Sequence, residues 1–362
     1  MTISNVLFED LAYVHRGVSN NKNFQEAVVL ITGCAGFLGF YFMQYFSRYG
    51  AELGIKKIIG LDNFLLGRPK WLSALEKDFP DLLYVKNFDV SNDNFGELPS
   101  TKEANYVIHA ASIASPSFYR KYPLETIDAN IWGLRAILDF YRSSTALRGL
   151  LFFSSSEIYG DPDPESIPTT EDYRGRVYCN GPRACYDESK RLGETLCWVY
   201  GTQFKMPVTV ARPFNNYGPG MAITDKRLPA DFARSVMRGE DLQILSNGSP
   251  TRTFCYVSDA ITGYLLCLLH GTYDYFNIGM DKPELTVRKL AEYFVSAGER
   301  VFGYSGQISF AESNDPNYLV DNPARRCPSI EKAKDKLGFS PSIEVEAGVL
   351  RYLRFLKDGI KL

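Results

Sequence analysis

The sequence predicts an α/β fold in which a Rossmann-type, doubly wound parallel sheet is followed by a smaller C-terminal lobe that binds substrate. Short apolar runs alternate with segments of helical periodicity through the first 212 residues. Continuous apolar runs of this kind are typical of parallel strands buried on both faces. The first run leads directly into a glycine-rich turn. The 362 residues, 45% of them hydrophobic, are enough for one large core with an added lobe.

Six strands and four helices are expected from this alternation. The strands are Val28–Thr32, Lys57–Leu61, Leu83–Phe88, Tyr106–Ala110, Gly149–Ser154 and Val208–Arg212. The helices are Gly36–Tyr49, Pro123–Ser143, Tyr186–Gln203 and Pro229–Arg238. Residues before the first strand are expected as either a short helix packed on the body or an ordered tail.

The pattern divides the chain into three parts. Residues 1–27 form an N-terminal extension, and residues 28–212 form the sheet domain, to which the chain returns near 255–280. Beyond Arg212 the alternation loosens into turn-rich loops and helical pieces broken by Pro and Gly. We therefore assign residues 213–254 and 281–362 to the smaller lobe.

Composition excludes several classes of function. A net charge of -2 provides no bulk attraction to nucleic acid or to an anionic membrane. Seven dispersed cysteines favour reduced thiols in a cytoplasm over a disulfide framework. With only three histidines, a histidine metal site is not expected. Neither a signal peptide nor a membrane-spanning segment is predicted.

The turn after the first strand carries glycines at three-residue spacing, in the run TGCAGFLG. Gly33 permits the tight turn, Gly36 allows a pyrophosphate to approach the backbone, and Gly39 lets the helix pack on the strand. Phe37 and Leu38 open that helix, whose N-terminus attracts phosphate. Because the turn follows a buried strand and opens a helix, it predicts a dinucleotide site.

The second strand ends at Asp62, whose carboxylate is expected to bind a ribose diol and to repel a 2′-phosphate. This favours NAD over NADP as cofactor. The alternative is that Asp62 is only a strand-end turn residue. Further residues at strand ends are expected to border the cofactor: Asn63, Asp89, Val90, Ala110 and Ala111. For Asp89 a purely structural role explains the pattern nearly as well.

Tyr186 and Lys190 lie four residues apart, and so share one face of the predicted helix. A free phenol has a pKa of about 10, and a nearby ammonium group is expected to lower that pKa. Ser155, at the end of the fifth strand, would orient a substrate oxygen. Tyr186 would then accept a hydroxyl proton while a hydride passes to the nicotinamide. The alternative is an exposed helix face without chemistry.

With these motifs the chain resembles the extended short-chain dehydrogenases/reductases of the NAD-dependent epimerase/dehydratase family, which act on nucleotide sugars. The resemblance runs from about residue 28 to the C-terminus. The motifs that support this resemblance are TGCAGFLG, HAAS at 109–112, SSSEIYG at 154–160, YDESK at 186–190, ARPFNNYGPG at 211–220 and RTFCYVSD at 252–259. Within the family, GPRACYDESKR, DNFLLGR, ASPSFYRKYP and RRCPSIEKAKDKLGFSP most resemble the UDP-glucuronate decarboxylases.

The resemblance implies roles for individual residues. Ser155, Tyr186 and Lys190 would be the catalytic triad, and Glu157 would lie beside C5 of the sugar. Four residues would bind the nucleotide sugar: Ser156, Asn215, Arg227 and Arg252. A guanidinium suits a diphosphate or a carboxylate. The resemblance also implies a homodimer, formed through the helices near 123–143 and 186–203.

All reactions of this family begin with oxidation of the sugar at C4. Ser156 stands where dehydratases carry an acid, and Glu157 is unusual for a 4-epimerase, so decarboxylation of UDP-glucuronate to UDP-xylose is favoured. The alternatives are a 4,6-dehydratase, a 4-epimerase or a C4 dehydrogenase for another sugar, or a non-catalytic NAD-binding sensor on the same fold. Asp128 stands where decarboxylases have a basic residue, and an acid facing a glucuronate would repel it.

Overall fold

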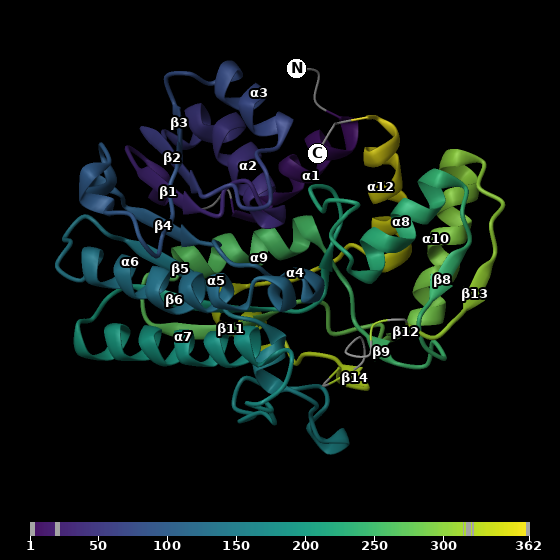
Figure 1. Cartoon of the computed structure of the whole chain (residues 1–362). Helices are drawn as coiled ribbons and strands as arrows, with labels where there is room; N and C mark the ends of the chain where they lie inside the picture. Colours follow the sequence, from purple (N-terminus) through teal and green to yellow (C-terminus); the bar gives the residue numbers. More distant parts are fainter. Residues whose placement is uncertain (1–3, 19–21, 314, 316–319, 321, 360–362) are drawn as a thin grey trace.

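The computed structural model describes residues 4–18, 22–313, 315, 320 and 322–359. Its centre is a seven-stranded parallel sheet with the strand order β11-β6-β5-β4-β1-β2-β3. The strands are β1 Val28–Thr32, β2 Lys57–Asp62, β3 Leu83–Asn87, β4 Tyr106–His109, β5 Gly149–Phe153, β6 Val208–Pro213 and β11 Asp274–Ile278. Figure 1 shows helices on both faces of this sheet and the smaller lobe beside it.

The six strands expected from the sequence are confirmed, and their ends differ from the prediction by one residue at most. The seventh strand, β11, follows helix α9 (Val257–Leu269) and pairs with β6 at the edge of the sheet. The chain thus returns to the sheet after its first excursion, close to the range expected from the sequence.

The two faces of the sheet are covered by different helices. Val29 and Ile31 of β1 pack in a core with α2 (Phe37–Leu53) and α9, while Val28 and Leu30 face α6 (Leu134–Tyr141) and α7 (Ala184–Gln203). All five residues of β1 are buried, which explains its unbroken apolar run.

The helix predicted over Pro123–Ser143 is confirmed as one continuous helical segment, Pro123–Tyr141, but its middle turn is not α-helical. The structure has α5 (Pro123–Ile127), a π-helical segment η4 (Asp128–Gly133) and then α6. π-Helical turns inside helices occur frequently at functional sites. Here the wider turn contains the buried Asn130, whose Nδ2 donates to Ser189 Oγ on α7 at 2.9 Å. Hydrophobic periodicity cannot distinguish such a turn from a regular helix, because the apolar residues on either side keep their spacing.

Besides α9 and β11, the described chain after β6 forms short strands and four helices. These helices are α8 Leu228–Arg238, α10 Val287–Phe302, α11 Glu331–Leu337, which packs on α9 and β11, and α12 Val345–Lys357. The short strands are β7 Asn216–Tyr217, β8 Leu242–Ile244, β9 Thr251–Arg252, β10 Cys255–Tyr256, β12 Leu285–Thr286, β13 Ile308–Phe310 and β14 Arg325–Arg326. The remaining helical elements are α3 Lys70–Asp78, α4 Pro116–Lys121, η1 Lys22–Phe24, η2 Phe95–Glu97, η3 Thr101–Glu103, η5 Ser156–Tyr159 and η6 Pro164–Ser166. Within the described ranges, no helix combines the length and apolar character needed to cross a membrane.

The N-terminal extension contains a helix, α1 (Asn5–Val18), packed on α2, α9 and α12 (Figure 1). Residues 1–3 and 19–21 of the extension lie outside the described residues. Asp10 on α1 is fully buried and accepts hydrogen bonds from the hydroxyls of Tyr41 at 2.7 Å and Tyr256 at 2.8 Å. Arg351 of α12 donates to the other carboxylate oxygen from Nε at 3.0 Å and Nη2 at 2.7 Å. One carboxylate thus joins α1 to both parts of the chain.

Replacing Asp10 with alanine should lower the free energy of unfolding by about 3–5 kcal/mol, because it leaves a partly buried guanidinium and two buried phenols without their partner. Denaturant unfolding measures the loss. Glu9→Ala is the matched control, since Glu9 contacts the same Arg351 at 2.9 Å but is 61% exposed. Its loss should stay below about 1 kcal/mol. Equal losses in the two variants would contradict the role given to Asp10.

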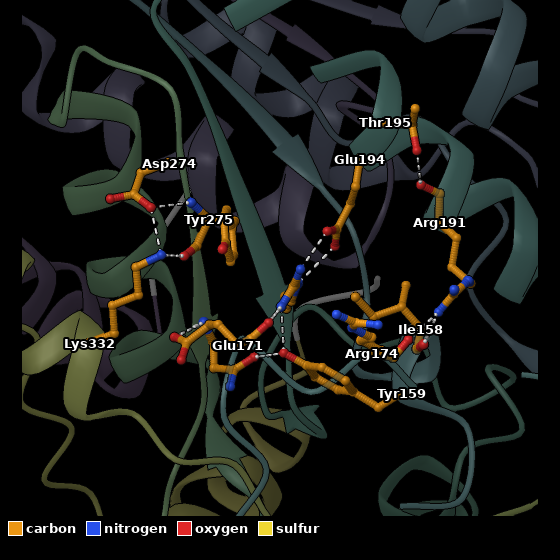
Figure 2. Close-up of polar contacts among 12 residues, drawn as sticks. Ile158, Tyr159, Glu171, Arg174, Arg191, Glu194, Thr195, Asp274, Tyr275 and Lys332 are labelled. Atoms are coloured by element: carbon orange, nitrogen blue, oxygen red, sulfur yellow. Dashed lines mark hydrogen bonds and ion pairs between the residues drawn. The ribbon is translucent and has the colours of Figure 1, made fainter. Parts of the chain in front are cut away.

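A pocket of about 600 Å³ lies on the side of α7 away from Tyr186 and Lys190, beside the edge strand β11. Figure 2 shows its polar contacts. At its floor the Arg212 guanidinium donates to both carboxylate oxygens of Glu194, at 2.8 and 2.6 Å, and to the hydroxyl of Tyr159 at 2.6 Å. A further bond to the Glu171 carbonyl completes the set. Because these groups satisfy one another's hydrogen-bonding capacity, we assign the Arg212 network a structural role.

Candidate active site

The glycine-rich turn between β1 and α2 has the geometry of a dinucleotide cradle. Gly33 has φ +70, and a Cβ atom there would lie 2.6 Å from backbone atoms of Ala110 and Ala111. A Cβ at Gly39 would overlap the backbone of Gly33 and Cys34. Helix α2 begins without a side-chain cap at Gly36, so its first N–H groups remain available to phosphate. The residues present therefore fit a bound dinucleotide.

Asp62 at the end of β2 lies against this turn. Its Oδ2 accepts from Ala35 N at 3.0 Å and its Oδ1 from Phe64 N at 2.8 Å. Burial raises the pKa of Asp62, and the two backbone hydrogen bonds oppose the shift. The carboxyl group thus lies where the second strand meets the glycine-rich turn, as the NAD hypothesis requires. The same two hydrogen bonds also fit the alternative, in which Asp62 only stabilises the turns at the end of the strand.

The other residues expected to border the cofactor have local partners. Asn63 accepts from Leu65 N at 3.1 Å, and Asp89 accepts from Ser91 N at 2.9 Å in a turn after β3. These contacts favour the structural reading of Asp89. Val90 is buried and packs on Gly133. Phe37, in the first turn of α2, lies under the Arg227 guanidinium, 5.6 Å from the ring centroid.

The structure brings Ser155, Tyr186 and Lys190 together, all of them buried. Ser155 hydrogen-bonds the Tyr186 hydroxyl, and its Oγ also accepts from Glu157 N at 3.2 Å. Lys190 lies one turn further along α7 and donates from Nζ to the Phe153 carbonyl at 2.7 Å. Its Nζ is 5.5 Å from the centroid of the Tyr186 ring.

The expected lowering of the Tyr186 pKa is wrong for this structure. Burial raises the pKa of Tyr186 to about 12, although the Ser155 hydrogen bond and the charge of Arg227 oppose the shift. Lys190 does not supply the stabilising charge, because burial lowers its own pKa to about 7. Burial is the largest cause of both shifts, and in each case it disfavours the charged form of the group.

Glu157 lies two residues after Ser155 of the triad and forms ion pairs with two arginines. Arg326 of β14 forms a bidentate pair with it, from Nη1 at 2.5 Å and Nη2 at 2.6 Å. Arg183, at the N-cap of α7, contacts the same carboxylate through Nη2. Burial alone would raise the pKa of Glu157, but the two guanidinium groups outweigh it and lower the pKa to about 2. Glu157 is therefore ionised and acts on its surroundings as a fixed charge.

The remaining residues expected to bind substrate lie on the lobe side or beside the triad. Ser156 is buried next to Glu157. Asn215, at φ +43, donates to the Thr253 carbonyl at 2.8 Å, which holds the loop after β6 on the lobe. Arg227 forms an ion pair with Asp225, and its charge acts on Tyr186.

Arg252, which the resemblance assigns to nucleotide-sugar binding, is buried and hydrogen-bonded to groups of the protein itself. Its guanidinium donates to the carbonyls of Thr251 at 2.7 Å and Pro323 at 2.5 Å, and to Asn322 Oδ1 at 3.2 Å. Burial and the charges of Arg326 and Arg183 lower the pKa of Arg252 to about 9. The Arg252 guanidinium thus lies close enough to Arg183 and Arg326 for their charges to act on it.

Residues 29–279 match the profile of the NAD dependent epimerase/dehydratase family. The chain belongs to this family. It is accordingly an NAD-dependent enzyme, and the cradle at Gly33, Gly36 and Gly39 is where its residues would hold the cofactor.

Two of the most similar relatives are decarboxylases by name. UDP-glucuronic acid decarboxylase 1 of Xenopus tropicalis is 33% identical over 333 residues, which is 92% of this chain and 73% of the relative. UDP-glucuronic acid decarboxylase 6 of Arabidopsis thaliana is 33% identical over 335 residues, covering 91% and 89% of the two chains.

Solved structures of the family share the fold at lower identity. UDP-glucose 4-epimerase of Thermotoga maritima, solved with UDP-glucose, superposes with a TM-score of 0.75 and 22% identity, covering 91% of this chain and 99% of its own. UDP-glucuronic acid 4-epimerase of Bacillus cereus, solved with UDP-glucuronic acid and NAD, gives 0.74 and 22%, with the same coverage. dTDP-glucose 4,6-dehydratase of Bacillus anthracis, solved with NAD, gives 0.75 and 20%, covering 92% and 97%.

Three residues at the site of this family member were missed in the sequence. Arg183 and Arg326 hold Glu157, and Tyr119 of α4 stacks on Tyr186 with 5.1 Å between ring centroids and 13° between planes. The Tyr119 hydroxyl is buried and has no hydrogen-bond partner among the described residues. All three stand inside runs that carried the resemblance, GPRACY, RRCPSI and ASPSFYRKYP, and only their spatial convergence reveals them.

Proposed function

We propose that the protein decarboxylates UDP-glucuronate to UDP-xylose. The observation that carries this proposal is the cluster of positive charge beside the triad: Arg183, Arg252 and Arg326 converge around the ionised carboxylate of Glu157. A guanidinium pairs preferentially with a carboxylate or a phosphate. A sugar that carries a carboxylate at C6 therefore matches this site better than a neutral hexose. The similar decarboxylases of frog and plant support the same substrate class.

In this reaction Ser155 orients the C4 hydroxyl, and Tyr186 accepts the hydroxyl proton in its phenolate form, which the positive charge of a bound nicotinamide would favour. NAD, which the glycine-rich turn at Gly33, Gly36 and Gly39 would hold, would supply the acceptor and donor for the C4 hydride. The C4 ketone makes the C6 carboxylate a β-keto acid, so the C5–C6 bond breaks with its electron pair moving toward the ketone. Carbon dioxide leaves, and C5 of the resulting enolate takes up a proton from solvent. Tyr186 then returns its proton to the C4 oxygen as the hydride is restored.

The arrangement also argues against dehydration. A 4,6-dehydratase must protonate a departing C6 hydroxyl, and the residue after the triad hydroxyl here is Ser156, not an acid. Glu157 cannot substitute as a proton donor, because its two arginines keep it ionised. Decarboxylation needs no such acid.

Asp128 is the departure that favours a second candidate, a 4-epimerase or another enzyme of the family that acts on a neutral sugar, because an aspartate facing a glucuronate would repel it. Asp128 opens the π-helical segment η4 and is half-buried. The carboxylates whose charges act on Tyr186 are Glu157 and Asp187. Decarboxylation stays the leading proposal because arginines surround Glu157 and similar relatives are decarboxylases by name.

The test is a panel of UDP-, dTDP-, CDP- and GDP-sugars given to the NAD-loaded protein, with products identified by mass. UDP-glucuronate should lose one carbon dioxide and yield a UDP-pentose, while UDP-glucose, its matched neutral control, should not turn over. An unchanged mass with a new stereochemistry at C4 would replace the proposal with epimerisation. NAD reduction by no sugar in the panel would favour the non-catalytic sensor.

We further propose a homodimer in the cytoplasm. Large apolar side chains stand exposed on the helices expected to form the interface: Leu124 at 70%, Trp132 at 59%, Leu192 at 45% and Trp198 at 53%. A second copy would remove them from water. The seven cysteines are free thiols, which supports a reducing compartment.

A further inference from the structure

Asp187, the residue directly after Tyr186, is a buried carboxyl group that the proposed reaction does not use. It is 5% exposed and lies in the first turn of α7, four residues after Arg183. Its Oδ2 is 3.6 Å from Arg183 Nε, longer than a hydrogen bond. Within the described part of the chain, Asp187 Oδ1 and Arg183 Nε have no hydrogen-bond partner. The two groups thus form an ion pair that is too long for a hydrogen bond.

Arg183 therefore stands between two carboxyl groups and is hydrogen-bonded to only one. Its Nη2 contacts Glu157, which Arg326 holds from its other side. The charged and titratable groups that face this pair from neighbouring elements are Arg326 of β14, Arg252 of β9, Tyr119 of α4 and Tyr186 of α7. Two buried carboxyls that share one guanidinium cannot ionise equally well.

The pKa values of the two carboxyl groups are shifted in opposite directions. Glu157 has both guanidinium groups and a pKa lowered to about 2. Burial, followed by repulsion from Glu157, raises the pKa of Asp187 to about 8, although Arg183 opposes the shift. At neutral pH the cluster thus holds one negative charge, not two.

We propose that Asp187 is a positioning residue that works as a neutral acid: while protonated it leaves Arg183 to Glu157 and to an anionic sugar, and on ionisation it draws Arg183 away and repels that sugar. The inference rests on the proposed function only for the choice of an acidic sugar. It predicts that a carboxylate-bearing nucleotide sugar binds progressively less tightly above pH 8.

The test is the affinity of the NAD-loaded Tyr186→Phe protein for UDP-glucuronate between pH 6.5 and 9.5, measured by calorimetry. The Kd should rise about tenfold from pH 7 to pH 9, since about one tenth of Asp187 keeps its proton at pH 9. Adding Asp187→Asn should abolish this rise. Adding Glu188→Gln, a matched change at the next position of α7 where the side chain is 41% exposed, should leave it intact.

A second measurement needs no substrate. A carboxyl whose pKa is higher folded than unfolded makes the folded protein bind more protons, so stability falls as pH rises from about 4 to about 8. The gain in melting temperature from Asp187→Asn should therefore grow from pH 5 to pH 8. An equal gain at both pH values, or an alkaline loss of affinity that survives Asp187→Asn, overturns the inference. If UDP-glucuronate binds with this pH dependence but loses no carbon dioxide, the proposed function fails and the inference stands.

Discussion

Replacing Tyr186 with phenylalanine should abolish turnover while the protein still binds NAD. The change removes only the hydroxyl that Ser155 contacts, and the ring keeps its stack on Tyr119. A positioned proton acceptor contributes about 10²–10⁴-fold to the rate, so a loss of at least 100-fold is expected. The measurement is formation of UDP-pentose under single-turnover conditions, beside the NAD content of the purified variant.

The matched control for this change is Tyr122→Phe. Tyr122 packs against the same small cluster as Tyr119 and Tyr186, so the substitution removes a neighbouring phenolic hydroxyl while leaving the Tyr186 hydroxyl in place. Its turnover should stay within a few-fold of the wild-type rate. Full activity in Tyr186→Phe would refute the role assigned to Tyr186, whereas loss of bound NAD would mean that the variant fails before chemistry begins.

The strands and the dinucleotide turn were predictable because their signals are local. The strand Val28–Thr32 is buried on both faces, so its first four residues are all apolar, and Gly39 is required by contacts with Gly33 and Cys34 only a few residues before it. The pairing of Tyr186 with Lys190 was equally local, since four residues make one turn of α7.

What was not predictable depends on long-range contacts. Arg326 lies 169 residues after Glu157 in the chain, and nothing in the sequence near either residue shows that they form a bidentate pair. The pKa of Tyr186 was wrongly expected to fall, because a sequence shows which charges are near along a helix but not how much water has been excluded. The N-terminal helix was left open for a similar reason: Asp10 finds its partners on α2, β10 and α12.

Replacing Glu157 with glutamine should both destabilise the protein and end decarboxylation. The amide keeps the shape of the side chain but removes the charge that balances Arg183 and Arg326, which are only 6% and 7% exposed. Leaving buried guanidinium groups without their counter-charge costs about 3–5 kcal/mol of unfolding free energy at pH 7. Turnover should fall with it, since the two arginines lose the group that orients them toward the sugar.

The pH dependence separates this electrostatic effect from a general packing defect. The pKa of Glu157 is lowered to about 2 in the folded protein, so its stabilisation is complete above the unfolded value near 4.5 and is lost as pH falls toward 2. The gap between wild type and Glu157→Gln, measured by urea unfolding, should therefore be widest at pH 7 and shrink below pH 4.5. The exposed Glu165→Gln change should stay within about 0.5 kcal/mol throughout. A gap that is constant with pH would show that Glu157 contributes shape and not charge, and the anionic-sugar proposal would lose its electrostatic basis.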